Sequence, residues 1–331
     1  MKYFIFITIL VLGVSLILPF SIQALTVSPI RFEIEGNPGQ ILTGEIELFN
    51  EQTISRTFYS SFENFQARGE GGEPHFLPEQ KGLATWINID ELRVVLEPNE
   101  RRKIPFTITI PKEAEPGGHF AAIFWGTTPP IPDGEGVVVG ARLGVLVLLT
   151  VDGEIKEGGG ILEFKTENRF FTSLPITLFY RFANDSGDRI MPKGEIKIRN
   201  ILGIEIAIMD ANPVLGNVLP ASIRRFEVQW DKTPNNTKLD TKTLNNTKGF
   251  FEIVEHQWQN FAFGMYTAEL SLSWREQTTN AIWRFFVIPW QLLSIILIIL
   301  IIVGFFAVIG IKRYNRWIIA KATSNKQQET I

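Results

Sequence analysis

The sequence predicts an all-β protein with two Ig-like β-sandwich domains in tandem, followed by one transmembrane α-helix. Two observations predict this fold class. From Leu25 to Trp290, apolar and polar residues alternate with a period of two in one segment after another, and no convincing amphipathic helix interrupts them. Leu292 to Ile311 are then 20 residues without a charged side chain, enough for a helix across the roughly 30 Å hydrocarbon core of a membrane.

Residues 1–24 are predicted to form a signal peptide. Lys2 is followed by an uncharged apolar run from Phe4 to Phe20, and Ala24 supplies the small residue that cleavage requires. An uncleaved N-terminal anchor is the alternative, because Ile22 is less typical than alanine at the third position before the cleavage point.

Residues 25–153 are predicted to form the first sandwich, and residues 154–160 a glycine-rich linker. The continuous apolar run from Val145 to Val151 is typical of a strand buried on both faces, and we expect it to close this domain. The apolar positions of the other strands, each between polar neighbours, include Phe32, Ile34, Ile46, Leu48, Ile104, Phe106, Ile108 and Ile110.

Residues 161–289 are predicted to form the second sandwich, with a turn at Asn184 to Asp188. The stretch from Asp231 to Lys248 is polar and contains Asn-Asn-Thr-Lys twice, so we expect an exposed loop. Both copies match the Asn-x-Thr glycosylation acceptor, a motif short enough to occur by chance. The apolar positions of the strands include Ile196, Ile198, Phe226, Val228, Trp230, Leu270, Leu272 and Trp274.

Residues 290–311 are predicted to form the transmembrane helix, and residues 312–331 a basic cytoplasmic tail. Trp290 lies where aromatic belts form, and Lys312, Arg313 and Arg316 follow the span at once, which marks its cytoplasmic side. A buried core helix is the alternative, but it would not need these flanking residues. The protein is therefore expected to be a single-pass membrane protein with its bulk outside the cytoplasm.

The charge balance has to be read with this topology in mind. The whole chain has a formal net charge of −3, but five of its basic residues lie in the predicted tail. Without that tail and the signal peptide, 26 basic and 34 acidic residues remain, a net charge of −8. A moderately acidic body on a basic stub gives no broad basic surface for nucleic acid.

Several kinds of chemistry are excluded by composition. The chain has no cysteine and only three histidines, far apart in sequence, so neither a disulfide framework nor a metal site is expected. It contains none of the motifs typical of nucleophilic hydrolases, zinc proteases, P-loops or EF-hands. We therefore expect no catalytic residues, no cofactor and no enzyme activity.

The aromatic residues are the candidates for binding. Among 26 Phe and 8 Trp, most are expected in the cores, because inward strand positions favour large residues. The glycine-rich stretch from Gln66 to Gly82 is predicted to be a loop, and loops on a rigid scaffold often carry binding residues. The candidate binding residues on and near this loop and in the neighbouring strands are Phe65, His75, Phe76, Trp86 and Trp125.

Several short motifs resemble a known family. They are Ser28-Pro29, Pro38-Gly39-Gln40, Trp86-Ile87, Leu96 to Glu100, Ile110 to Phe120, Val218 to Ser222 and Gly264 to Ala268. Together with the layout of the chain, they resemble the WxL-interacting proteins of bacterial surfaces. That resemblance implies a peptidoglycan-binding Ig-like domain, a second Ig-like domain for host or partner binding, a transmembrane helix and a short basic tail. Tyr266 resembles a tyrosine corner, in which a buried hydroxyl bonds back to the backbone.

The first domain is also similar to the N-terminal domain of periplasmic pilus-assembly chaperones, which use an edge strand to complement a client. In that case Val145 to Val151 would be the edge, although those chaperones lack a membrane span. Two functions therefore stay open. The first is an adhesive or scaffolding surface protein whose partners are the membrane and peptidoglycan or other surface proteins. The second is an assembly factor that works by strand addition.

Overall fold

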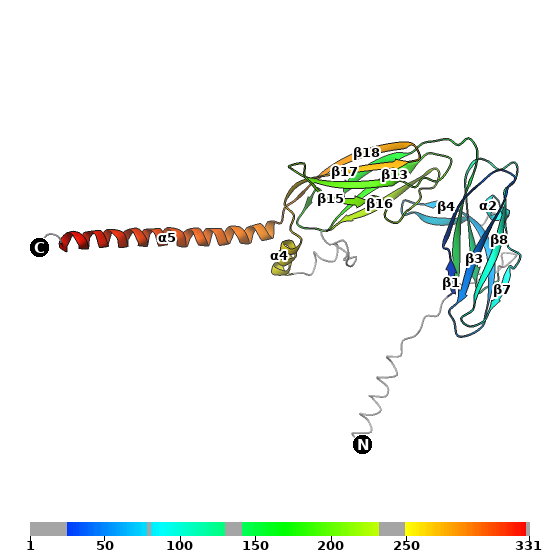
Figure 1. Cartoon of the computed structure of the whole chain (residues 1–331), viewed down its shortest axis with the longest axis horizontal. Helices are drawn as coiled ribbons and strands as arrows, with labels where there is room; N and C mark the ends of the chain where they lie inside the picture. Colours follow the sequence, from blue (N-terminus) through cyan, green and yellow to red (C-terminus); the bar gives the residue numbers. More distant parts are fainter. Residues whose placement is uncertain (1–24, 78–80, 130–140, 232–248, 329–331) are drawn as a thin grey trace, which may run out of the picture.

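The computed structural model describes residues 25–77, 81–129, 141–231 and 249–328, with side-chain environments up to residue 317. Two β-sandwiches meet at an angle, and one long helix leaves the second sandwich at the end far from the first (Figure 1). The predicted signal peptide and the predicted loop after Asp231 lie outside the described residues.

The first sandwich consists of two sheets that enclose one core. The smaller sheet has the order β1 (Leu25–Ser28), β3 (Ile41–Asn50), β8 (Arg101–Thr109) and β6 (Ile87–Asn88). The larger sheet has the order β2 (Arg31–Gly36), β10 (Arg142–Val151), β9 (Gly117–Gly126), β4 (Arg56–Arg68) and β5 (Glu73–Leu77), with β7 (Arg93–Leu96) also on β4. All pairs are antiparallel except β2 with β10.

The second sandwich repeats this plan. Its smaller sheet has the order β11 (Gly160–Thr166), β13 (Ile176–Asn184) and β16 (Ser222–Trp230). Its larger sheet has the order β12 (Phe170–Phe171), β18 (Gln277–Val287), β17 (Gly264–Trp274), β14 (Lys193–Asn200) and β15 (Glu205–Asp210). In both domains the first strand runs antiparallel in the smaller sheet, and the chain then crosses to lie parallel to the last strand in the larger one.

The structure confirms the buried face that the alternation predicts for each strand. Ile104, Phe106 and Ile108 of β8 are at most 2% exposed, and Leu270 and Leu272 of β17 are buried in the same way. Because the side chains of a strand alternate between its faces, these residues enter the space between two sheets while their polar neighbours face water.

Tyr266 confirms the expected tyrosine corner. Its side chain is buried, and its hydroxyl donates to the carbonyl of Phe263 at 3.3 Å and accepts from the amide of the same residue at 3.2 Å. The corner thereby ties the start of β17 to the segment before it.

The strand that ends the first domain is central rather than an edge. Leu146 to Val151 pair with β2 on one side and with β9 on the other, so the edge expected from Val145 to Val151 is wrong. Val147 and Leu149 are fully buried on the inner face of β10, and Leu148 is 3% exposed on its outer face. The run is therefore buried on both faces, as its apolar pattern, interrupted only by Thr150, predicts.

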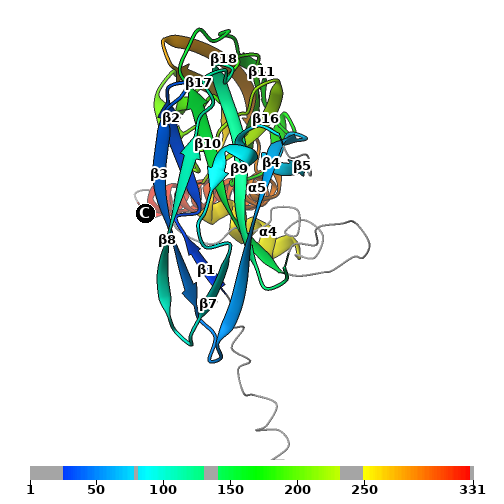
Figure 2. The same ribbon diagram turned by 90° about the vertical axis from the view of Figure 1, so that its right-hand side faces the viewer.

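The stretch from Gln66 to Gly82 is not the open loop that its glycines suggested. β4 runs on to Arg68 and pairs with β5, with Phe65 opposite Phe76. The two strands form a hairpin that reaches over the second sandwich, as the view turned by 90° also shows (Figure 2). The short helix α2 (Leu83–Trp86) follows it.

Two helical features differ from the sequence prediction. α4 (Phe250–Gln259) lies within the predicted all-β region, so the expectation of no helix there is wrong. α5 (Trp290–Gln328) begins where predicted but continues beyond Ile311. The residues after Ile311 include no proline and are mostly good helix formers, so nothing ends the helix there.

A candidate binding site between the two sandwiches

The outer face of the larger sheet of the first sandwich carries an apolar cluster of its own. Phe65 of β4, Phe124 of β9 and Leu148 of β10 are 6%, 5% and 3% exposed. The ring centroids of Phe65 and Phe76 are 6.1 Å apart, and those of Phe76 and Phe124 are 4.8 Å apart. This face is turned toward the second sandwich, whose Leu219 packs against the cluster.

The tip of the β4–β5 hairpin joins the two sandwiches. The guanidinium of Arg181 on β13 donates to both carboxylate oxygens of Glu70, at 2.5 and 2.8 Å, and the amide of Arg225 donates to the Glu70 carbonyl at 2.8 Å. The hydrogen bond from Arg181 holds the pKa of Glu70 below its usual value. A two-pronged contact of this kind fixes orientation as well as distance.

A second bridge lies at the turn after β13. The Thr150 hydroxyl of β10 donates to the buried carboxylate of Asp188 at 3.0 Å, and the amide of Gly118 donates to the carbonyl of Gly187 at 3.0 Å. Asn217 of the second sandwich donates to Glu33 of the first at 2.9 Å. The angle between the sandwiches is therefore set by several contacts, which involve both backbone groups and buried side chains.

Replacing Gly117 by alanine should change the angle between the sandwiches. Gly117 has a φ of +117°, and a Cβ there would overlap the carbonyl oxygen of Gly187. Because both the backbone conformation and the space favour glycine, the two domains must separate to admit a methyl group. The chain has no native cysteine, so spin labels on Arg93→Cys and Asn280→Cys can report the distance between domains.

We expect a narrow distance distribution in the parent and a shifted or broadened one in Gly117→Ala. Gly71→Ala is the control, because a Cβ at that position meets nothing within 4 Å. Equal distributions in both variants would contradict the prediction.

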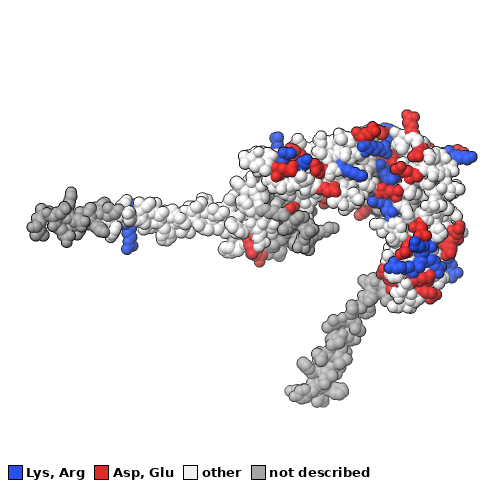
Figure 3. All heavy atoms as spheres, viewed as in Figure 1, with Lys and Arg blue, Asp and Glu red and all other residues white. Residues whose placement is uncertain are grey.

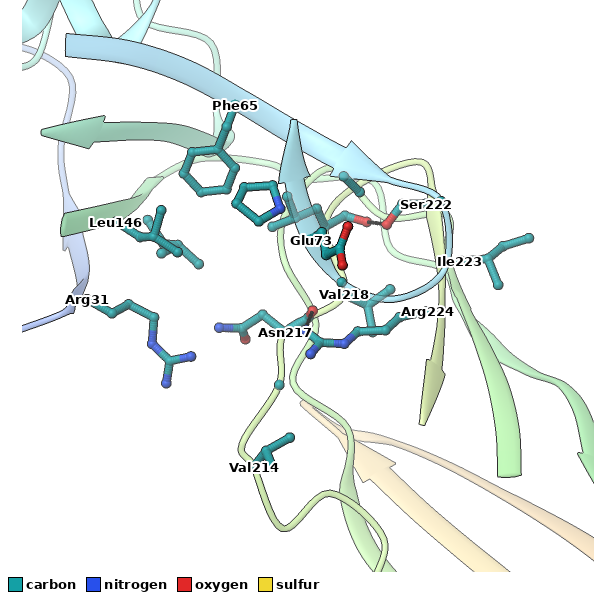
Figure 4. Close-up of a pocket in the computed structure, with 17 residues that line it drawn as sticks. Arg31, Phe65, Glu73, Leu146, Val214, Asn217, Val218, Ser222, Ile223 and Arg224 are labelled. Atoms are coloured by element: carbon teal, nitrogen blue, oxygen red, sulfur yellow. Dashed lines mark hydrogen bonds between the residues drawn. The ribbon is translucent and has the colours of Figure 1, made fainter. Parts of the chain in front are cut away.

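A pocket of about 240 Å³ lies between the hairpin, the outer sheet face and the second sandwich. One wall is apolar and consists of Phe65, Leu146 and Leu148. Figure 4 shows Arg31 and Arg224 on opposite sides of the pocket, with Asn217 between them. The pocket thus combines an apolar wall with two cationic groups and one acidic group, Glu73.

The two arginines are held differently. Arg31 pairs with Glu33 at 2.9 Å, and Arg224 donates to the carbonyl of Asn217 at 2.7 Å. Burial lowers the pKa of the Arg224 guanidinium, and the positive charge of Arg31 adds to this effect. A carboxylate bound between the two would relieve their repulsion, because Arg recognises carboxylates with paired donors.

Comparisons with known proteins bear on the fold. A scan against protein-family models finds no family that matches, and a search of curated proteins finds no match either. The class 5 fimbriae chaperone CfaA is 12% identical, with 79% of this chain and 99% of that chain covered and a TM-score of 0.37. The E. coli chaperone DraB is 9% identical, with 78% of this chain and 96% of that chain covered and a TM-score of 0.35.

Identities this low show only an Ig-like fold, and TM-scores this low carry no partner or residue role over to this chain. The resemblance to the WxL-interacting proteins has no matching family model behind it and stays a proposal.

The structure brings some of the predicted binding residues together and separates others. Phe65 lines the pocket, and Phe76 packs in the same cluster, while His75 is exposed on β5. Trp86 lies elsewhere, with its ring centroid 4.7 Å from that of His119. Trp125 is fully buried in the core of the first sandwich, so it offers no surface to a ligand.

Arg31 and Arg224 were not among the predicted site residues. They come from different domains, and no local motif connects them, so only the packing of the two sandwiches brings them to one pocket. The residues predicted to flank a membrane lie on α5: Trp290 at its start, and Lys312, Arg313 and Arg316 exposed on its later turns.

In the described part of the chain, α5 is the one helix long and apolar enough to cross a membrane, from Trp290 to Trp317. Figure 3 shows its first part free of charge, whereas both sandwiches carry interspersed charges of both signs.

Proposed function

We propose that this chain is a membrane-anchored, non-enzymatic bacterial surface protein that binds a segment of a partner protein between its two sandwiches. The observation that carries the proposal is the pocket with one apolar wall and two arginines. α5 anchors the chain, and the two sandwiches extend from the outer side of the membrane. The interdomain bridges hold the pocket open at a fixed angle, which reduces the ordering cost of binding.

The chemistry of the pocket favours a protein segment over a glycan. Phe65, Leu146 and Leu148 form an apolar wall, and a glycan hydroxyl turned toward this wall would lose its hydrogen bond to water without gaining another. An apolar side chain beside an acidic group fits both the wall and the arginines. Peptidoglycan binding, which the family resemblance implies, is the competing outcome of the test.

The test uses the full chain in lipid nanodiscs with a photo-crosslinking amino acid at position 146, in the pocket wall. A matched probe at position 162 is the control, because Leu162 is exposed on β11 outside the pocket. We expect a surface-protein fraction to give a discrete adduct at position 146 and none at 162, and purified peptidoglycan to sediment no protein.

The second part of the experiment replaces the two pocket arginines. Arg31→Gln and Arg224→Gln should each reduce the adduct about tenfold, as expected when a charge-assisted hydrogen bond is lost. Arg284→Gln, exposed on β18, should leave it unchanged. The proposal would be overturned if the adduct yield at position 146 stayed the same in both arginine variants. It would also be overturned if the protein sedimented with peptidoglycan and gave no adduct with surface proteins.

A second candidate function is strand addition, and β15 favours it. Within the described residues β15 pairs only with β14, so its other edge is open. Ile206 and Ile208 are 48% and 54% exposed on this strand. An open apolar edge is a template for another strand. Replacing both residues by lysine should abolish partner capture if this edge is the site, and should leave the adduct at position 146 intact if it is not.

A further inference from the structure

The end of the second sandwich nearest α5 exposes a group of large aromatic side chains. Such residues are normally buried, and a group of them on one surface marks a contact. The group consists of Phe251, Trp258, Phe261, Phe263 and Trp290, which are 79%, 68%, 43%, 57% and 56% exposed.

α4 is tied directly to the start of α5. The Gln257 side chain is fully buried, donates to the Gln291 side-chain oxygen at 2.5 Å, and accepts from the amide of Leu292 at 2.9 Å. That amide belongs to the first turn of α5, whose N–H groups have no partner within the helix. The position of α4 is therefore fixed relative to the membrane-spanning helix, beside which it lies in Figure 1.

The two sides of α4 differ in chemistry. Phe251 and Trp258 are seven residues apart and lie on the same side of the helix. Glu252 and Gln259 lie on the adjacent side and are exposed to water, and the exposed Glu255 lies at the border between the two sides. This is the pattern of a helix that rests on an apolar boundary with its polar side turned away.

The length of the apolar helix places this surface at the lipid boundary. Trp290 to Trp317 is 28 residues. At 1.5 Å per residue this is about 42 Å, close to the thickness of a bilayer with its headgroups. Trp290 then lies at headgroup level, where tryptophan is favoured, and α4 is held at the same level through Gln291 and Leu292.

We propose that α4, together with Phe261, Phe263 and Trp290, lies in the outer interface of the lipid bilayer. This inference rests on the proposed anchoring by α5. The contact is made by aromatic side chains, and α4 contains two glutamates and neither lysine nor arginine, so it does not depend on anionic lipids. It orients the second sandwich against the membrane and leaves the first sandwich displayed beyond it.

The test is the quenching of tryptophan fluorescence in the full chain, reconstituted in phosphatidylcholine vesicles that contain a lipid brominated near the headgroup. The chain has eight tryptophans, so the signal of Trp258 is obtained by subtracting Trp258→Phe from the parent. We expect this component to be quenched by the brominated lipid and protected from aqueous iodide, with no gain from added anionic lipid.

Trp283→Phe is the matched control. Trp283 is half-buried on β18 against the core of the second sandwich, and its difference signal should not respond to the brominated lipid. A Trp258 signal that iodide quenches and the lipid does not would overturn the inference. Resistance of the chain to carbonate extraction reports the anchor separately. If the chain resists extraction while Trp258 stays in water, only the inference about α4 fails; if it is extracted, both fail.

Discussion

Replacing Trp125 by alanine should destabilise the first sandwich by about 3–5 kcal/mol, the usual cost of truncating a buried tryptophan. Trp125 is fully buried on the inner face of β9, where it is among the largest side chains of the core. The cavity left by the indole can close only if the two sheets move together, and the strands on either side of β9 restrict that movement.

Trp125→Phe is the informative control. The indole Nε1 of Trp125 is buried and has no hydrogen-bond partner among the described residues, so phenylalanine removes an unsatisfied donor while it keeps an aromatic ring. We expect this variant to lose much less stability than Trp125→Ala. Hydrogen exchange of the β9 and β10 amides in the full chain measures the difference, and amides of β14 and β17 serve as an internal reference. Similar losses for the two variants would contradict a packing role.

Replacing Asn184 by aspartate should destabilise the second sandwich by about 3–5 kcal/mol, because it creates an uncompensated buried charge. Asn184 is 1% exposed. Its amide nitrogen donates to the carbonyls of Asp188 and Val218 at 2.8 and 2.7 Å, and its oxygen accepts from Ser186. A carboxylate would lose both donated bonds and face two carbonyl oxygens instead.

Asn200→Asp is the matched control for this substitution. The Asn200 side-chain oxygen accepts from the amides of Leu202 and Ile204 at 3.0 and 2.9 Å, a role that a carboxylate can perform as well. Hydrogen exchange of β13 and β16 should therefore rise strongly in Asn184→Asp and little in Asn200→Asp. Equal effects would show that the donated bonds of Asn184 are not what stabilises this turn.

Both sandwiches have a buried asparagine at the end of the corresponding strand of the smaller sheet. Asn50 ends β3 as Asn184 ends β13, and both side chains are buried. The Asn50 amide donates to the carbonyls of Ile54, Leu96 and Glu97. In each case one side-chain amide donates hydrogen bonds to several backbone carbonyls of a turn. These bonds stabilise the fold, because a buried carbonyl without a hydrogen-bond partner raises its free energy.

Much of the fold could be predicted from local pattern. The alternation in β8 and β17 shows which face is buried, since side chains of a strand point to opposite faces wherever the strand lies. α5 could be predicted as a long apolar helix, because that feature depends on length and composition alone. The tyrosine corner at Tyr266 was likewise visible as a local motif.

The sequence pattern did not indicate a helix at α4, and the reason is physical. Gln257 occupies its most buried position, where an amphipathic pattern requires an apolar residue. Its amide is stabilised there by Gln291 and the amide of Leu292, partners that lie in α5. The β4–β5 hairpin was missed because its glycines indicate a loop, whereas its tip is held by Arg181 of the other sandwich.

The sequence by itself determined the two β-sandwich domains, the buried face of their strands and the long apolar helix at the C-terminal end, because these follow from periodicity and composition along a short stretch of chain. Only the tertiary structure decided how the two sandwiches meet and which side chains line the space between them. It buried Trp125, joined the domains through Glu70 and Asp188, and brought Arg31 and Arg224 to one pocket. Such contacts depend on residues that are distant in sequence, and no local pattern records which of them will meet.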